Sequence, residues 1–266
     1  MMHKNYKLMI IDLDGTMYRG NERIDEAAPF VQQLVETGQD YIFLTNNSTK
    51  TTSDVLTHLQ GFDIPVKPEQ VYTTSKAAAD YVTRESQAPS VYMIGEKGLQ
   101  QALSEAGCRL VDSEEELQHC DYVIIGLDRH VTYEKLAKAT IAVRAGATFI
   151  STNADKALPT ERGLLPGNGA ITSVVETATR TAPLYIGKPE SLMLDMILKE
   201  KQIEQSDALL IGDNYDTDIS TGIRAGVDTA IVFTGFTSKE ELEKKKAQPT
   251  YKWDHLLQYE HDITLG

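Results

Sequence analysis

Two aspartates near the start of the chain, Asp12 and Asp14, follow a short apolar run and are separated by one residue. Residues i and i+2 of a β-strand point to the same face, so these carboxylates should emerge together where the strand opens into a loop. Like charges at such a separation repel each other, and a metal cation or a shared proton relieves the repulsion. Gly15 then allows the backbone to turn sharply. The stretch predicts a divalent metal and a carboxylate placed to act on a substrate.

Two further segments offer groups that could bind phosphate. Thr45 and Asn46 follow an apolar run and begin a polar, uncharged stretch. Its hydroxyl, amide and backbone N–H groups can hold phosphate oxygens without adding charge. Lys188 lies between Gly187 and Pro189 and can serve as a point charge on a phosphate while offsetting nearby carboxylates.

The fourth segment begins at Asp213, which directly follows the apolar run Leu210-Ile211-Gly212. Its carboxylate is suited to bind Mg²⁺ as a hard oxygen ligand. Asn214 comes next, and two more acids, Asp216 and Asp218, follow within about a turn. Aspartate and asparagine at a strand end are commonly turn or capping residues, so no one segment is decisive. The hypothesis of a shared site rests on the four segments together.

Short apolar runs alternate with longer amphipathic segments, which favours βα units and a parallel sheet that is covered on both faces. In open α/β sheets the ligand binds at the carboxyl edge of the strands, where the polar segments are expected. The expected strands are 7–12, 41–46, 91–95, 122–127, 148–152, 208–213 and 229–234. The expected helices are 26–37, 51–60, 75–85, 97–106, 133–145, 171–179, 191–200 and 217–225.

The composition excludes several classes of protein. The net charge of −13 argues against a surface for nucleic acid or an anionic membrane. The two cysteines, Cys108 and Cys120, are too few for a disulfide framework and fit a reducing compartment. The N-terminal residues enter the first strand directly, and no apolar run approaches the ~20 residues that cross a bilayer. We expect a cytoplasmic protein without a nucleic-acid or membrane partner.

Two proline-containing stretches, 86–89 and 180–183, follow expected helices and could be hinges. The segment between them carries its own strand and helix signals. The sequence therefore predicts a core domain formed by residues 1–87 and 183–266, with a second α/β domain inserted as residues 88–182.

The four segments resemble the motifs of haloacid dehalogenase superfamily phosphatases. The similarity is strongest to the branch with a C2-type cap, which includes NagD-like and p-nitrophenyl-phosphatase-like enzymes. Asp12–Thr16 matches the first motif, Thr45 the second, Lys188 the third and Asp213–Asp218 the fourth. The resemblance covers the whole chain and is loosest in the insertion. It implies a Rossmann-like, doubly wound parallel sheet core with an inserted α/β cap domain.

The resemblance also implies a role for each matched residue. Asp12 would be the nucleophile that forms an aspartyl-phosphate. Asp14 would be the general acid that protonates the leaving alcohol and then the general base that activates water. Thr45, with the Asn46 backbone, would bind the phosphoryl group, and Lys188 would steady both Asp12 and the phosphate.

The implied cofactor is Mg²⁺. The resemblance places it on Asp12, on Asp213 and on the main-chain carbonyl of Asp14, with Asp218 and Asn214 in support. The metal and Lys188 would screen the repulsion between a carboxylate nucleophile and an anionic phosphate.

The implied reaction is the hydrolysis of a small phosphomonoester, a sugar phosphate or a nucleotide, so the partner is a small phosphorylated metabolite. Cap loops of the family reach toward the substrate, which makes Asn153, Glu161 and Arg162 candidate specificity residues. The last two lie in a stretch, 159–169, that is expected to be a glycine- and proline-rich loop. The resemblance also allows a homo-oligomer.

Two alternative functions remain open from the sequence. The first is a phosphomutase or a dehalogenase of the same fold, although a dehalogenase would not need Asp14 or a metal. The second is a non-enzymatic receiver-like module that carries a phospho-aspartate, which the chain length and the large insertion argue against.

Overall fold

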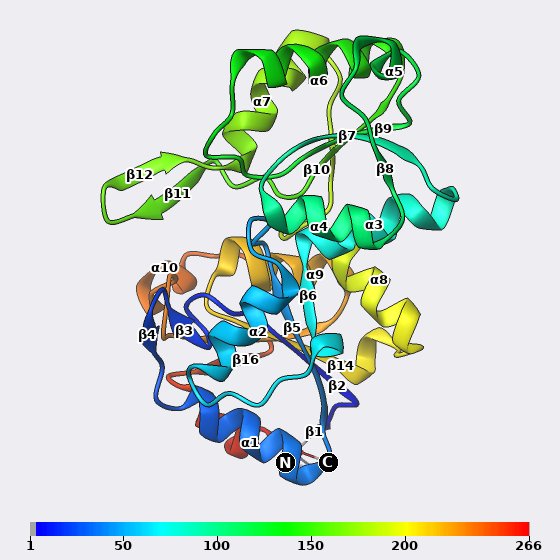
Figure 1. Cartoon of the computed structure of the whole chain (residues 1–266). Helices are drawn as coiled ribbons and strands as arrows, with labels where there is room; N and C mark the ends of the chain where they lie inside the picture. The colour runs from blue at the N-terminus through cyan, green and yellow to red at the C-terminus, as the bar shows by residue number, and fades with distance from the viewer. Residues whose placement is uncertain (1–3, 266) are drawn as a thin grey trace. The chain divides into compact units, whose positions relative to one another are not determined.

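The computed structural model describes residues 4–265 and divides the chain into two compact units. Unit 1 contains Met1–Thr45, Ser53–Tyr72 and Lys188–Gly266, and unit 2 contains Asn46–Thr52 and Thr73–Gly187. Along the chain, unit 2 is inserted between parts of unit 1 (Figure 1).

Unit 1 is built on a six-stranded sheet in the order β16-β15-β14-β2-β5-β6. The pairs from β16 through β5 are all parallel. The chain runs from β2 to β5 on one side and from β14 to β15 on the other, so the strand order reverses between β2 and β14. Such a reversal marks where a ligand binds in an open α/β sheet. The strands are β2 (Leu8–Ile11), β5 (Asp40–Thr45), β6 (Val71–Thr73), β14 (Ala208–Gly212), β15 (Asp228–Val232) and β16 (Tyr251–Trp253).

The central strands of unit 1 are buried on both faces, which explains their continuous apolar sequences. Met9 and Ile11 of β2 face a core that includes Phe30 of α1 and Leu59 of α2. The longer helices are α1 (Ala27–Thr37), α2 (Thr52–Gln60), α8 (Leu192–Lys201), α9 (Ser220–Ala225) and α10 (Lys239–Glu243). Shorter elements are η1 (Pro68–Gln70), η2 (Gln205–Asp207), the π-helix η3 (Tyr215–Ile219), η4 (Leu256–His261), the pair β1 (Lys4–Asn5) and β17 (Ile263–Thr264), and the hairpin β3 (Tyr18–Arg19) and β4 (Glu22–Arg23).

Unit 2 has a parallel sheet of its own, in the order β13-β10-β9-β7-β8. Helices α6 and α7 cover one face of this sheet, and α3 and α4 cover the other (Figure 1). The strands are β7 (Ser90–Ile94), β8 (Arg109–Leu110), β9 (Tyr122–Ile125), β10 (Thr148–Ser151) and β13 (Leu184–Tyr185). The helices are α3 (Thr74–Glu85), α4 (Lys97–Glu105), α5 (Glu114–Leu117), α6 (Tyr133–Ala145) and α7 (Asn168–Thr179).

The predicted fold class, a parallel α/β core with an inserted α/β unit, is confirmed. The predicted boundaries at 87/88 and 182/183 stay predictions. The compact units divide the chain at other points, because α3 packs against α4 and the stretch Asn46–Thr52 is bonded to residues of unit 2.

The prediction of a loop over 159–169 is wrong. The antiparallel strands β11 (Ala157–Thr160) and β12 (Gly163–Pro166) form a hairpin there, and α7 begins at Asn168. The hairpin extends away from the rest of unit 2 (Figure 1). The Thr160 hydroxyl donates to the Gly163 carbonyl at 2.8 Å and closes the turn. The sequence did not indicate this hairpin, because the prolines and the glycine in it are residues typical of loops.

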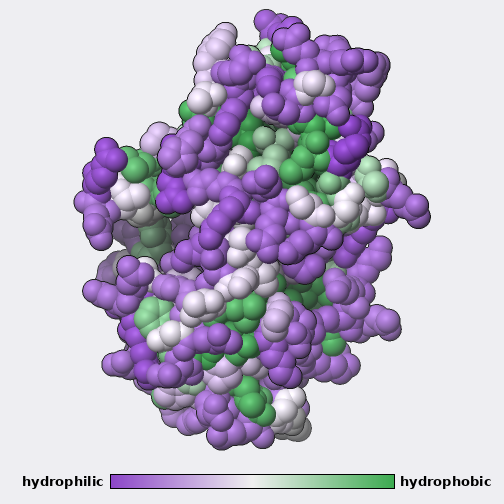
Figure 2. Space-filling view, viewed as in Figure 1, coloured by the Kyte–Doolittle hydropathy of each residue, from purple (hydrophilic) through white to green (hydrophobic). Residues whose placement is uncertain are grey.

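Hydrophilic residues cover most of the face shown in Figure 2, with apolar groups between them. Within residues 4–265 no helix combines the length and the apolar character that a membrane span requires.

Candidate active site

Three buried carboxylates of unit 1 come together at the strand-order reversal. Asp12, Asp213 and Asp218 each place one carboxylate oxygen within 4.8 Å of the others. The Lys188 ammonium donates to Asp12 Oδ1 and, at 2.6 Å, to Asp218 Oδ1. All four side chains are buried. The structure therefore brings together four of the residues that the sequence singled out.

The two central strands place the first two of these carboxylates. Asp12 is the residue after β2, and Asp213 is the residue after β14. The Asp12 N–H donates to the carbonyl of Ile211 at 2.9 Å, so the two strand ends are bonded to each other. The side-chain hydroxyl of Thr16 lies 3.4 Å from a carboxylate oxygen of each aspartate.

The π-helix η3 places the third carboxylate. Asp218 Oδ2 accepts from the Asn214 N–H at 3.0 Å, and the Asp218 N–H donates to the Asn214 carbonyl at 2.8 Å. The Asn214 side chain accepts from the Asp216 N–H at 3.0 Å and so caps the π-helix. Asn214 therefore supports Asp218 through its backbone N–H and carbonyl.

Two glycines leave room for the Asp213 carboxylate. A Cβ on Gly15 would lie 2.3 Å from Asp213 Oδ2, and the backbone there has a φ of +90° that side chains rarely allow. A Cβ on Gly235 would lie 1.9 Å from the same oxygen. Both positions must remain glycine if the carboxylate is to keep its place.

The stretch 234–237 after β15 also contacts Asp213, and the sequence analysis did not identify it. The Phe236 N–H donates to Asp213 Oδ2 at 2.6 Å, and the Thr237 N–H donates to the Asp213 carbonyl at 3.1 Å. The Thr234 hydroxyl donates to the Gly15 carbonyl at 2.7 Å. Because the backbone supplies most of these contacts, residue type carries little signal for them.

The crowded charges shift the proton equilibria of the cluster. Burial and the Asp218 charge raise the pKa of Asp12, although Lys188 opposes this. Burial and the Asp218 charge also raise the pKa of Asp213, to about 6, against the hydrogen bond from Phe236. Burial alone would lower the pKa of Lys188, but its ion pairs with Asp12 and Asp218 outweigh burial and raise it. The carboxylates thus need positive charge beyond that of one lysine.

The donor set fits a divalent cation. Three carboxylates and one ammonium leave two formal negative charges in a buried space. Hard oxygen ligands in such an arrangement suit Mg²⁺. Asp12, Asp213 and Asp218 all lie close enough to contribute. Asp218 already accepts hydrogen bonds on both oxygens, from Lys188 and from the Asn214 N–H.

Asp14 and Thr45 are also in unit 1. Asp14 is exposed in the turn after β2, where the Gly15 N–H donates to the Tyr18 carbonyl at 2.7 Å, and the carboxylate cluster does not include it. Burial, then the charges of Asp14 and Asp12, raise the pKa of Tyr18. Thr45 is the buried last residue of β5. The exposed Asp14 and the buried Asp12 have the different environments that two separate roles require.

The remaining candidates lie in unit 2. Asn46 begins the stretch that follows Thr45, and its carbonyl accepts from the Asn153 side chain at 2.9 Å. Asn153 itself is buried. Glu161 and Arg162 are exposed at the tip of the β11–β12 hairpin. The three predicted specificity residues therefore have different surroundings, and only the last two face solvent.

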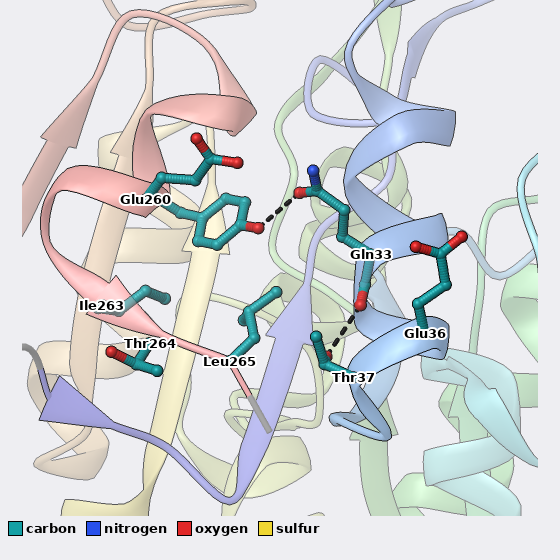
Figure 3. A pocket seen from close by; sticks show the side chains of 8 residues that line it. Gln33, Glu36, Thr37, Glu260, Ile263, Thr264 and Leu265 are labelled. Atoms are coloured by element: carbon teal, nitrogen blue, oxygen red, sulfur yellow. Dashed lines mark hydrogen bonds between the residues drawn. The ribbon is translucent and has the colours of Figure 1, made fainter.

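A cavity of about 410 Å³ lies at the surface of unit 1, between α1 and the C-terminal elements η4 and β17 (Figure 3). None of its lining residues belongs to the carboxylate cluster. They are Gln33, Glu36, Thr37, Tyr259, Glu260, Ile263, Thr264 and Leu265.

Comparison with known proteins places this geometry in a family. Residues 9–109 match the family of haloacid dehalogenase-like hydrolases, and residues 185–259 match a second family described as HAD-hydrolase-like. An acid sugar phosphatase of Staphylococcus haemolyticus is 52% identical over 253 residues, which are 95% of either chain. This chain belongs to the haloacid dehalogenase-like hydrolases. The 5′-nucleotidase YutF of Bacillus subtilis is 46% identical over 96% of this chain and 98% of its own.

Solved structures agree with this membership. A thermostable NPPase of Geobacillus stearothermophilus is 47% identical, with a TM-score of 0.87, over 96% of this chain and 98% of its own. A glycerol phosphate phosphatase of Mycobacterium tuberculosis, solved in complex with magnesium, is 31% identical, with a TM-score of 0.86, over 96% of this chain and 76% of its own. The predicted family and the predicted enzyme class, a phosphatase, are confirmed. The roles of individual residues stay predictions.

Proposed function

We propose that this haloacid dehalogenase-like hydrolase hydrolyses small phosphomonoesters, of the sugar phosphate or nucleotide class, with Mg²⁺ and through an aspartyl-phosphate on Asp12. One observation carries the proposal: Asp12, bonded to Lys188, lies beside Asp213 and Asp218 where the strand order reverses. The activities of the two relatives named above, an acid sugar phosphatase and a 5′-nucleotidase, support the substrate class, and the magnesium complex of the Mycobacterium tuberculosis phosphatase supports the metal.

The residues of unit 1 account for both halves of the reaction. An oxygen of Asp12 attacks phosphorus while the bond from phosphorus to the leaving oxygen breaks. Asp14 donates a proton to that leaving oxygen, which departs as the alcohol. A water then attacks the phosphoryl group on Asp12, and Asp14 takes a proton from it. Phosphate leaves, and the Asp12 carboxylate is restored. Splitting the hydrolysis in this way replaces one difficult step with two easier ones.

Lys188 contributes to both steps because it is buried and held by two carboxylates. It fixes the Asp12 side chain and offers positive charge to the equatorial phosphoryl oxygens, in a place where water screens little. Bound Mg²⁺ would neutralise the remaining charge of the cluster and stabilise the charge that develops on the phosphoryl group.

The decisive experiment replaces Asp12 by asparagine, which keeps the shape of the side chain but removes its negative charge. With p-nitrophenyl phosphate and Mg²⁺, we expect Asp12→Asn to lose about 10³-fold or more in kcat. Asp128→Asn is the matched control, because Asp128 is also a buried aspartate that is paired with a lysine, in unit 2. Undiminished turnover by Asp12→Asn would refute the assigned nucleophile.

The same assay can separate hydrolysis from the phosphomutase alternative. With a sugar phosphate as substrate, a hydrolase releases inorganic phosphate and free sugar in equal amounts. An isomeric sugar phosphate without release of phosphate would favour the mutase.

A further inference from the structure

The stretch that follows Thr45, residues Asn46–Thr52, is here called the connecting loop. The connecting loop belongs to unit 2 and is hydrogen-bonded to several other parts of that unit, although Thr45, the residue before it, ends a strand of unit 1. Its bonds run from the Ser75 hydroxyl to the Ser48 carbonyl at 3.0 Å, from the Leu127 N–H to the Ser48 hydroxyl at 3.1 Å, and from the Gly98 N–H to the Thr49 carbonyl at 3.1 Å. Helices α3 and α4, and Leu127 just after β9, thus all help to hold this loop.

The carbonyl of Asn46 is held by two side chains at once. It accepts one hydrogen bond from the Thr74 hydroxyl at 3.0 Å and another from Asn153 Nδ2 at 2.9 Å. Thr74 is fully buried and Asn153 is 4% exposed. Because a carbonyl oxygen has two lone pairs, these two donors satisfy it completely.

The Asn153 amide has only one orientation that fits its neighbours. Its Oδ1 accepts from the backbone N–H of Asp155 at 3.1 Å, while its Nδ2 faces the Asn46 carbonyl. A backbone N–H can only donate and a carbonyl can only accept, so the amide cannot be turned around. Asn168 in turn donates to the Asn153 carbonyl at 2.8 Å and steadies the backbone there. Asn153 is therefore a fixed donor rather than a mobile surface group.

The same residues pack around the residue before Lys188. A Cβ on Gly187 would lie 2.6 Å from Asn46 Oδ1 and 2.7 Å from the Thr74 methyl group. The Gly187 N–H donates to the Thr152 carbonyl at 2.8 Å. Asn46 and Gly187 therefore lie close together within unit 2. In the chain, Asn46 follows Thr45 and Gly187 precedes Lys188.

The peptide bond is planar, so a fixed Asn46 carbonyl also fixes the direction of the Asn47 N–H, which lies in the same plane. The N–H of Asn46 is attached to the same Cα as this carbonyl, so it is held nearby as well. We propose that Thr74 and Asn153 are positioning residues for phosphoryl binding, which fix the backbone N–H groups that follow Thr45. Neither residue touches the reacting atoms in this proposal. The inference rests on the proposed function, because it concerns the phosphoryl-binding stretch of that reaction.

Two substitutions of nearly unchanged shape test the proposal. Thr74→Val removes the hydroxyl donor, and Asn153→Asp replaces the amide donor with a carboxylate oxygen that faces the carbonyl. With p-nitrophenyl phosphate and Mg²⁺, we expect each variant to lose about tenfold in kcat with a KM within about twofold. Thr74→Ser keeps the donor and should keep at least half of the wild-type kcat.

Thr140→Val is the matched control within unit 2. Its hydroxyl donates to the Leu136 carbonyl at 2.8 Å, so it also loses one bond from a threonine to a backbone carbonyl, but at α6. We expect it to leave kcat within twofold, and its melting temperature is measured beside that of Thr74→Val. A kcat loss that follows the melting temperature across all variants would overturn the proposal.

Amide hydrogen exchange, measured by mass spectrometry without substrate, gives a second readout. We expect exchange in peptides that cover Asn46–Ser48 to become about tenfold faster in Thr74→Val and Asn153→Asp and to stay unchanged in Thr140→Val. An active wild type whose Thr74→Val and Asn153→Asp variants match the control in kcat would overturn this inference alone. A wild type that releases no phosphate would overturn the proposed function and this inference with it.

Discussion

Each unit contains a parallel sheet whose strand order reverses once near its middle, between β2 and β14 in unit 1 and between β7 and β9 in unit 2. In open α/β sheets a ligand binds at the carboxyl ends of the strands where the strand order reverses, so either reversal could hold one. In unit 1 this edge holds Asp12 and Asp213. In unit 2 the connecting loop covers it, since the Leu127 N–H donates to Ser48 and a Cβ on Gly126 would lie 3.1 Å from the same hydroxyl.

The two edges also differ in charge balance. In unit 2, the buried Asp128 pairs with Lys135 at 2.6 Å, and Glu96 binds the Arg129 guanidinium at 2.6 and 2.8 Å. In unit 1, Asp12 and Asp218 both pair with Lys188, and the Asp213 carboxylate lies beside them. Topology therefore provides two equivalent places, and unbalanced buried charge identifies the one that can bind a cation and a phosphate.

The largest expected effect comes from replacing Lys188, compared with the same replacement of Lys135 at the other edge. Lys188→Met leaves three buried carboxylates without their cation, and we expect kcat/KM to fall about 10³-fold at saturating Mg²⁺. Lys135→Met is the matched change at the other edge, where the lysine is 40% exposed, and should stay within about threefold of wild type. Steady-state kinetics with p-nitrophenyl phosphate decide the comparison, and similar losses in both variants would break it.

A smaller effect is expected in the pH dependence of stability without divalent metal. The folded pKa of Asp213 is about 6, whereas an unfolded aspartate titrates near 3.9, so the folded state binds more protons between these values. The free energy of unfolding should therefore fall as the pH rises from about 4 to 6, and Asp213 contributes at most about 3 kcal/mol of this fall. Asp213→Asn should reduce this fall but not abolish it, because the raised pKa of Asp12 also contributes. Mg²⁺ should reduce it too, because it neutralises the crowded charges.

Glu96 in unit 2 should titrate with the opposite sign. Its hydrogen bonds from Arg129 hold the pKa of Glu96 below its ordinary value, against burial. Its stabilising contribution is present above the unfolded pKa and is lost as the pH falls through the folded pKa. Glu96→Gln should therefore reduce the loss of stability in acid and leave the fall toward pH 6 unchanged. Urea unfolding at several pH values, with EDTA or with Mg²⁺, measures how the free energy of unfolding changes with pH. If Asp213→Asn and Glu96→Gln showed the same pH dependence, the predicted difference in sign between the two sites would be wrong.

The sequence predicted the central strands to within about a residue because β2, β5 and β14 are apolar runs buried on both faces. The same logic located Asp12 and Asp213, since a polar residue that ends such a run lies at the carboxyl edge. The direct contact between Asp218 and Lys188 could not be derived from spacing alone. It depends on the π-helix η3, whose single wide turn leaves no clear periodic signal.

Other features depend on contacts between distant parts of the chain. The hydrogen bond from Thr74 to the Asn46 carbonyl requires that α3 begin beside Asn46, and nothing in the local sequence indicates this. The short strand β16 carries only three residues, too few for a strand pattern, although it extends the sheet of unit 1. Strand periodicity is informative over about four to eight residues, so such elements are found only once the fold is known.

The smallest expected effect concerns the hairpin tip, which carries the exposed charges Glu161 and Arg162. Exposed charges are screened by salt, so the double variant Glu161→Gln/Arg162→Gln should change kcat/KM for p-nitrophenyl phosphate by less than about threefold. If the tip contributes to specificity, the ratio of kcat/KM between a sugar phosphate and a nucleoside monophosphate should shift by about threefold, and more at low salt. Competition assays at two salt concentrations measure this ratio. An equal loss for every substrate would instead mean that the hairpin tip affects the chemical step that all substrates share. The contrast between the buried carboxylate cluster of unit 1 and the exposed tip charges of unit 2 would then be wrong.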